Sequence, residues 1–184
     1  TLQRPNEGDW IAAPIAGGTQ VALFPAVSIP STPRARIEAV ASSCRIEVDV
    51  ADGDIRAVTV DAFADRLAVL HCAELLGAAE HCLALSIAYL KDREQFGQPI
   101  GANQALKHIA ADTYLAQENI RVAVEYAAAA RDAADANRSD ETLRAASVQA
   151  VEVMLAYVPR AAREIAETAI HLHGGIGLTW DYGL

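Results

Sequence analysis

The pattern of apolar and polar residues changes character near residue 60. Before that point the two kinds alternate over short runs, most clearly in Gln20–Phe24 and Cys44–Val50, which is the period of half-buried strands. The second run leads to Ala-Asp-Gly-Asp at 51–54, a turn signal. Two or three such strands have little core of their own. We therefore predict that residues 1–60 are the tail of a β-domain.

After residue 60 the apolar positions take a helical period. Long helices are predicted over 62–94 and 103–135, and a third begins after residue 139. Positions about seven apart form one stripe on each helix. The stripe residues are Val69, Cys72, Leu76, Ala79, Leu83, Ser86 and Leu90, then Leu106, Ile109, Thr113, Ala116, Ile120, Ala123 and Ala127, then Ser147, Val151, Met154, Val158, Ala161, Ile165 and Leu172. Such stripes favour a mainly α fold, an up-down helical bundle over 61–184 with room for a fourth helix.

Local signals set the bounds of the third helix. Ser139 is a candidate N-cap, followed by the acidic Asp140 and Glu141 in the first turn. Pro159 is expected to kink the helix, because proline removes a backbone hydrogen bond and clashes with the preceding turn. The glycine cluster at 174–177 is expected to end it.

Composition and charge exclude several classes of protein. A formal net charge of −9 argues against a nucleic-acid binder, which needs a basic face. No run approaches eighteen uninterrupted apolar residues, so we expect no membrane insertion. The first residues do not resemble a signal peptide, and three cysteines without metal-ligand spacing are expected to be free thiols. A cytoplasmic location is therefore predicted.

The turn after the first helix carries one candidate binding element. Arg93, Gln95 and Phe96 place a guanidinium, an amide and an aromatic ring close together. A guanidinium can hold a pyrophosphate by paired hydrogen bonds, and an aromatic ring can lie against a ring system. The alternative is a solvated helix end with Phe96 as an apolar plug under the turn.

The second element is the glycine-rich run His171–Gly177. Glycines let the backbone approach a ligand and expose N–H groups to an anion, although at a helix end they also serve as a cap and turn. His171 and His173 point to different sides of a helix, so no metal site is predicted there.

Together, the two elements resemble the acyl-CoA dehydrogenase family. Its motif Tyr-x-x-x-Arg-x-Gln-Phe-Gly-x-Pro-Ile corresponds to Tyr89–Ile100, its Gln-x-x-Lys to Gln104–Lys107, and its Gln-x-x-Gly-Gly-x-Gly to His171–Gly177. Gly77 falls where the family has a helix-packing glycine. The similarity covers about 110 residues, from about residue 73 to 184.

The resemblance implies that residues 61–184 are the C-terminal helical domain of that family, which binds FAD and forms oligomers, and that residues 1–60 are the remnant of its middle β-domain. It also implies an FAD site shared between subunits. Carried over by position, the FAD-binding residues are Arg93, Gln95, Phe96, Gln104, His171, Gly174 and Gly175. His171 stands where the family has Gln. The resemblance further implies an acyl-CoA substrate, electron-transferring flavoprotein as the acceptor, and a homodimer, a homotetramer or a heteromer with a related subunit.

In the family a carboxylate removes the α-proton of an acyl-CoA and FAD takes the β-hydride, which gives a trans-2-enoyl-CoA. The base is usually a Glu beyond the glycine motif, outside these residues, and some members place it where this chain has Leu67. Asp61 and Asp65 lie nearby but are more typical of helix caps, and Arg66 is two positions from the family's CoA-contacting arginine. The catalytic residue is therefore unknown. The predicted function is FAD-dependent acyl-CoA dehydrogenation by an incomplete chain. The alternatives are a non-catalytic partner subunit and a structural bundle without flavin.

Overall fold

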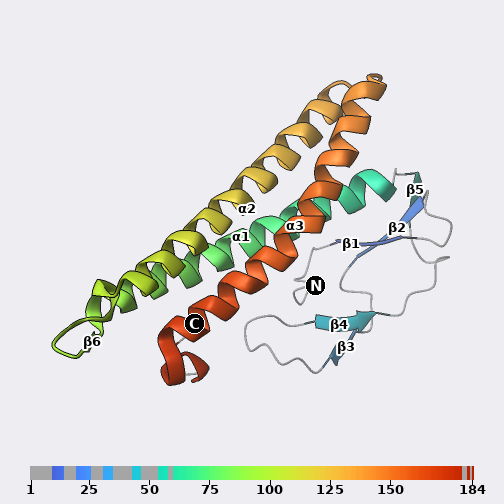
Figure 1. Cartoon of the computed structure of the whole chain (residues 1–184). Helices are drawn as coiled ribbons and strands as arrows, with labels where there is room; N and C mark the ends of the chain where they lie inside the picture. The colour runs from blue at the N-terminus through green and yellow to red at the C-terminus, as the bar shows by residue number, and fades with distance from the viewer. Residues whose placement is uncertain are drawn as a thin grey trace. The chain divides into compact units, whose positions relative to one another are not determined.

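The structure is a computed structural model, and it describes residues 10–14, 20–25, 31–34, 43–46, 54–57, 60–179, 182 and 184. The chain divides into two compact units, residues 1–64 and 65–184, and each is described by itself. The predicted mainly α fold, a helical bundle preceded by a few β-strands, is confirmed (Figure 1).

Five short strands precede the helices. β1 (Trp10–Pro14), β2 (Gln20–Pro25) and β5 (Asp54–Ala57) form an antiparallel sheet in the order β1-β2-β5. β3 (Ser31–Arg34) and β4 (Ser43–Ile46) pair separately. The strand predicted from residue 20 is β2. β4 covers the start of the strand predicted over 44–50, and residues 47–53, with most of the predicted turn, lie outside the described part of the chain.

Three helices of 33 residues each follow: α1 (Val60–Asp92), α2 (Gln104–Ala136) and α3 (Glu141–His173). They run up and down beside one another, and α1 and α2 are joined at one end by a hairpin of β6 (Glu94–Gln95) and β7 (Gln98–Pro99) (Figure 1). Two short 3₁₀ helices, η3 (Ile100–Ala102) and η4 (Gly174–Leu178), lie at the same end of the bundle as this hairpin.

Small and medium side chains on the predicted stripes form the core. The residues with almost no exposed surface include Ile120 of α2, and Met154, Val158 and Ile165 of α3. α1 contributes Cys72, which is buried with them. The stripe prediction was wrong at Ile109, which is exposed. Buried alanines lie among these larger side chains, and their small size lets the helices approach closely.

The signals for α3 were only partly interpreted correctly. Asp140, not Ser139, is the N-cap, because its Oδ1 accepts hydrogen bonds from the backbone N–H groups of Thr142 (2.9 Å) and Leu143 (3.2 Å). A carboxylate at this position satisfies two donors and complements the helix dipole, which a serine hydroxyl does less strongly. Pro159 lies inside α3, and Figure 1 shows this helix changing direction partway along, in keeping with the predicted kink.

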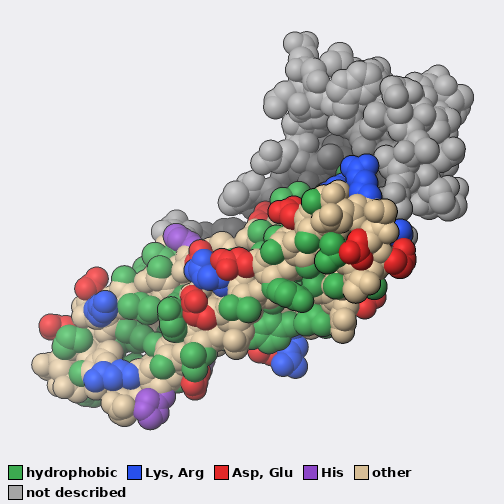
Figure 2. All heavy atoms as spheres, turned by 90° about the horizontal axis from the view of Figure 1, so that it is seen from above, with side chains coloured by type: hydrophobic (Ala, Val, Ile, Leu, Met, Phe, Trp, Pro, Cys, Tyr) green, Lys and Arg blue, Asp and Glu red, His purple; other side chains and the backbone are tan. Residues whose placement is uncertain are grey.

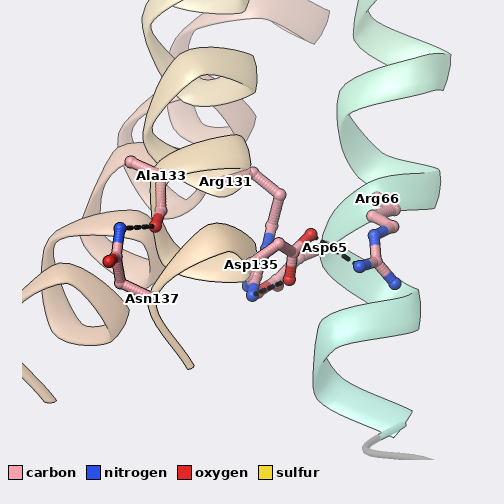
Figure 3. Close-up of polar contacts among 6 residues, drawn as sticks. All are labelled: Asp65, Arg66, Arg131, Ala133, Asp135 and Asn137. Carbon is pink, nitrogen blue, oxygen red and sulfur yellow. Dashed lines mark hydrogen bonds and ion pairs between the residues drawn. The ribbon is translucent and has the colours of Figure 1, made fainter. Parts of the chain in front are cut away.

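Ion pairs join the beginning of α1 to the end of α2. Arg131 donates from Nη1 to Asp65 and from Nη2 to Asp135, each at 3.1 Å, and Arg66 donates to the second oxygen of Asp135 (Figure 3). The Arg66 guanidinium, more than that of Arg131, holds the pKa of Asp135 below its ordinary value. Two residues from each helix thus form one charged cluster, which fixes the register of α1 against α2 at this end.

Large hydrophobic side chains also remain on the outside of the bundle. Figure 2 shows them spread between charged residues over one face. α2 and α3 bound a groove of about 240 Å³, lined by Ala123, Tyr126, Ala146, Gln149, Ala150, Val153 and Met154. The segment Phe63–Asp92 of α1 is long and apolar enough to cross a membrane by length and composition alone, although this helix packs through Cys72 into the bundle core. Exposed hydrophobic side chains of this kind are typical of a surface that packs against another protein chain.

Candidate functional site

The hairpin between α1 and α2 presents the first predicted binding element. Gln95 pairs with Gln98, and Phe96 (φ 54°) and Gly97 (φ 77°) between them both have positive φ. This is the geometry of a type I′ turn, which matches the twist of a two-stranded hairpin. The backbone N–H of Arg93 donates to the carbonyl of Tyr89 (2.8 Å), so the hairpin continues directly from the last turn of α1.

The side chains of this hairpin project into solvent. Arg93 and Gln95 are exposed, and Phe96 is 100% exposed. The interpretation of Phe96 as an apolar plug under the turn is therefore wrong. An aromatic residue with positive φ costs on the order of 1 kcal/mol, and its ring contributes nothing to the hydrophobic core of this chain. Such a residue is suited to contacting something outside the chain.

Gln104 begins α2 beside this hairpin. The helix starts behind Asn103, whose Oδ1 accepts a hydrogen bond from the N–H of Ala105 (3.0 Å). The Gln104 side chain is exposed, and its Nε2 lies 3.0 Å from Nε2 of His108, one turn further on. The amide nitrogen donates and the imidazole accepts, so the amide oxygen of Gln104 stays available.

The glycine-rich element forms the end of α3. His171 is exposed in the last turn. Gly174 has φ 64°, and its N–H donates to the carbonyls of Ile170 and His171, which closes the helix. Gly175 is also exposed, and a Cβ at this position would have nothing within 4 Å. The prediction of a helix cap is thus correct for Gly174. At Gly175 the backbone is exposed and no side chain covers it, and the nearby His171 is exposed as well.

The structure brings these two elements to one end of the bundle. Tyr89, in the last turn of α1, lies with its ring centroid 4.6 Å from that of His173, the last residue of α3. Tyr182 completes the cluster, with its ring 4.9 Å from His173. This contact between helix ends was not predicted, because nothing in the local pattern pairs residues more than 80 positions apart. The one indication of this contact in the sequence is His173, a histidine on the apolar side of the last turn of α3.

The arrangement can hold a large anionic ligand that also carries a ring system. Its donors are the Arg93 guanidinium, the amides of Gln95 and Gln104, and the His171 imidazole, and Phe96 supplies an aromatic face. These groups fit the pyrophosphate and ring of a dinucleotide. Within the described part of the chain, no three His, Cys, Asp or Glu residues gather as metal ligands.

Of the two carboxylates near the start of α1, the structure describes the side chain of Asp65. Asp65 is engaged by Arg131, which gives it a structural role in the cluster of Figure 3. Arg66 likewise pairs with Asp135 and is committed to that cluster. Leu67 is partly exposed and has no ionisable group. The side chain of Asp61 lies outside the described residues.

Gly77 was expected to be a helix-packing glycine. A Cβ at this position would have nothing within 4 Å, so Gly77 is not closely packed against any of the described residues. In contrast, Gly101 is required by its surroundings, since a Cβ there would lie 2.6 Å from the carbonyl oxygen of Leu90. The glycine with close neighbours is therefore in η3, directly after the hairpin, where it lies against the last turns of α1.

Comparison with known proteins gives concordant results. The family described as "Acyl-CoA dehydrogenase, C-terminal domain" matches residues 59–184. The acyl-CoA dehydrogenase IpdE2 of Mycobacterium tuberculosis is 40% identical over 121 residues, which are 66% of this chain and 33% of that protein. The chain thus spans about a third of the length of this curated relative.

Solved structures of related proteins share the fold. The Tcur3481-Tcur3483 steroid ACAD is 25% identical with a TM-score of 0.74, over 95% of this chain and 46% of that one. The ChsE4-ChsE5 complex from Mycobacterium tuberculosis is 26% identical with a TM-score of 0.67, over 92% of this chain and 45% of that one. The chain belongs to the acyl-CoA dehydrogenase family, a family of flavoprotein oxidoreductases, and carries its C-terminal helical domain.

Proposed function

We propose that this chain forms part of an FAD-dependent acyl-CoA dehydrogenase and binds FAD at the exposed end of its bundle. The observation that carries the proposal is the meeting of two distant elements. The segment 93–104, which contains the hairpin and the start of α2, and the turn at 171–175 lie at one end of the bundle. The contact of Tyr89 with His173 joins them. Every side chain assigned to FAD from the sequence points away from the core of the chain.

Each proposed contact has a physical basis. Arg93 would hold the pyrophosphate, Phe96 would lie against a ring of the cofactor, and Gln104 would accept or donate one hydrogen bond through its free amide oxygen or its nitrogen. The backbone at Gly174 and Gly175 would approach closely because no side chain stands in the way. When bound, FAD supplies the two-electron oxidation; the residues of this chain bind and orient it.

A site made only of exposed side chains at one end of a bundle covers one side of a ligand. The other side would come from another subunit, and the apolar groove between α2 and α3 supports such an assembly. Homodimer, homotetramer and heteromer with a related subunit all satisfy this requirement.

The position of Leu67 favours a second candidate function. Neither a carboxylate at position 67 nor a free carboxylate at Asp65 is present to remove a proton. In this alternative the chain is a non-catalytic subunit of a heteromeric dehydrogenase. It contributes one side of the FAD site and leaves proton abstraction to its partner.

The first experiment is purification of the protein with whatever subunit accompanies it, followed by intact mass and absorbance between 350 and 500 nm. A flavin spectrum that an acyl-CoA bleaches supports the dehydrogenase, and two distinct masses in the complex support the heteromer. A colourless protein that does not take up added FAD, alone or with its partner, contradicts both and leaves a structural bundle.

Matched variants locate the flavin site. Arg93→Gln should weaken FAD binding at least tenfold, because a charge-assisted bidentate contact is lost. Arg144→Gln removes a guanidinium that is also exposed from the first turn of α3, at the opposite end, and should leave FAD binding unchanged. Equal effects of the two substitutions would contradict the proposed location.

The remaining assignments follow from the family. We propose an acyl-CoA thioester as the substrate, electron-transferring flavoprotein as the electron acceptor and the cytoplasm as the location. Stopped-flow measurement of flavin reoxidation by electron-transferring flavoprotein and by oxygen distinguishes a dehydrogenase from an oxidase.

A further inference from the structure

A cluster of three rings joins the last turn of α1 to the end of α3, at the end of the bundle that carries the proposed flavin site. His173 is only 3% exposed, and the rings of Tyr89 and Tyr182 contact it from α1 and from the segment after α3. Tyr89 and Tyr182 themselves meet edge to face, with centroids 6.2 Å apart. Offset and edge-to-face contacts of this kind stabilise aromatic clusters beyond simple burial.

One hydrogen bond fixes the orientation of the buried imidazole. Nδ1 of His173 lies 2.7 Å from the carbonyl oxygen of Ala169, so Nδ1 carries the proton and donates it. Nε2 is buried and has no hydrogen-bond partner among the described residues. A buried acceptor without a donor does not stabilise the fold. The role of His173 that the structure supports is therefore to place its ring against the rings of Tyr89 and Tyr182.

Each of the two main rings is tied to one half of the proposed site. The carbonyl of Tyr89 accepts the N–H of Arg93 at 2.8 Å, so a shift of Tyr89 moves the hairpin. Gly174 follows His173 directly, and a Cβ added at Gly177 would lie 3.0 Å from Cβ of His173. The glycine-rich turn therefore folds back against His173, and the position of this residue determines its path.

We propose that the contact between Tyr89 and His173 holds the two FAD-binding elements in register, which makes His173 a positioning residue for the cofactor. The inference rests on the proposed function. Two ligand-binding segments whose anchoring residues, Tyr89 and His173, are 84 positions apart must keep one mutual geometry, and a ligand binds more weakly when it has to order them itself. The contact between the rings of Tyr89 and His173 holds the two segments in this geometry before FAD binds.

The test compares three variants of the protein in its purified assembly, with FAD dissociation measured by fluorescence at a temperature where all are folded. His173→Ala removes the ring contact and should weaken FAD binding about tenfold. His173→Phe keeps a ring and should bind FAD within about twofold of the wild type, with stability close to that of the wild type because removal of the unpartnered Nε2 offsets loss of the Nδ1 hydrogen bond. Val158→Ala, a fully buried core position elsewhere in α3, is the control for general loss of stability and should leave FAD binding unchanged.

A double-mutant cycle adds a readout that a general structural role does not produce. Tyr89→Ala and His173→Ala should each weaken FAD binding, and together little more than either alone, because both remove the same contact. Unchanged FAD affinity of His173→Ala, equal weakening by Val158→Ala, or additive losses in the cycle would each overturn the inference while leaving the proposed function in place. Failure of the wild-type assembly to bind FAD would overturn the proposed function, and the inference with it.

Discussion

Replacement of Arg131 by methionine tests the charged cluster between α1 and α2. Methionine keeps most of the length and apolar volume of the side chain but removes both contacts to carboxylates. Arg131 is 12% exposed, and its partners Asp65 and Asp135 are 19% and 27% exposed. Asp65 would lose the one ion-pair partner that the structure shows, and Asp135 would keep Arg66.

The expected cost lies between two known limits. Breaking one side of a fully buried pair costs about 3–5 kcal/mol, and an exposed pair contributes about 0.2–1 kcal/mol. Since these side chains are mostly but not fully buried, we expect Arg131→Met to lower the free energy of unfolding by about 2 kcal/mol. Urea unfolding at pH 7, followed by circular dichroism at 222 nm, measures this.

The pH dependence of the free energy of unfolding tests the same ion pairs independently. The folded pKa of Asp135 is lowered, first by Arg66 and then by Arg131, so this carboxylate stabilises the protein above its unfolded pKa of about 3.9. That contribution is lost as the pH falls through the folded pKa. The difference between wild type and Arg131→Met should therefore be full at pH 7 and shrink below about pH 4.

The matched control is Arg144→Met. Arg144 pairs with Glu141 across one turn of α3, and both side chains are largely exposed, so the loss should stay below about 0.5 kcal/mol. Equal losses for the two variants, or a loss for Arg131→Met that persists unchanged at pH 3, would refute the reasoning.

Three further outcomes follow from the local structure. Phe96→Asn should leave the protein as stable or more stable by about 0.5 kcal/mol in thermal unfolding, because Asn-Gly is the preferred type I′ turn, and it should weaken FAD binding; a clear loss of stability would mean that the ring packs within this chain. Asp140→Ala should destabilise the protein by about 1 kcal/mol through loss of the N-cap, and Ser139→Ala should not; the reverse order would restore the sequence-based assignment. Burial raises the pKa of the Cys72 thiol, so a disulfide reagent should modify it slowly in the folded protein at pH 8 and quickly after denaturation, whereas equal rates would contradict its burial.

Much of the architecture was accessible from local pattern. The helical period predicted all three helices to within about two residues at the ends that could be compared, because a long amphipathic stripe needs a partner whatever surrounds it. The β-strands were found less completely, since β1 and β3 are short and carry little alternation. The proposed cofactor residues came from the family resemblance, and they remain a proposal.

Local pattern was therefore enough to find the three helices, their apolar stripes and the family resemblance. Three features emerged only after the helices had packed: Phe96 is exposed rather than a plug, Asp65 belongs to an ion-pair cluster with Arg131, and Tyr89 contacts His173. Each of these depends on which residue lies opposite after the helices pack. Local periodicity specifies the face of a helix that is buried; the partner across the interface is set by how three helices pack together.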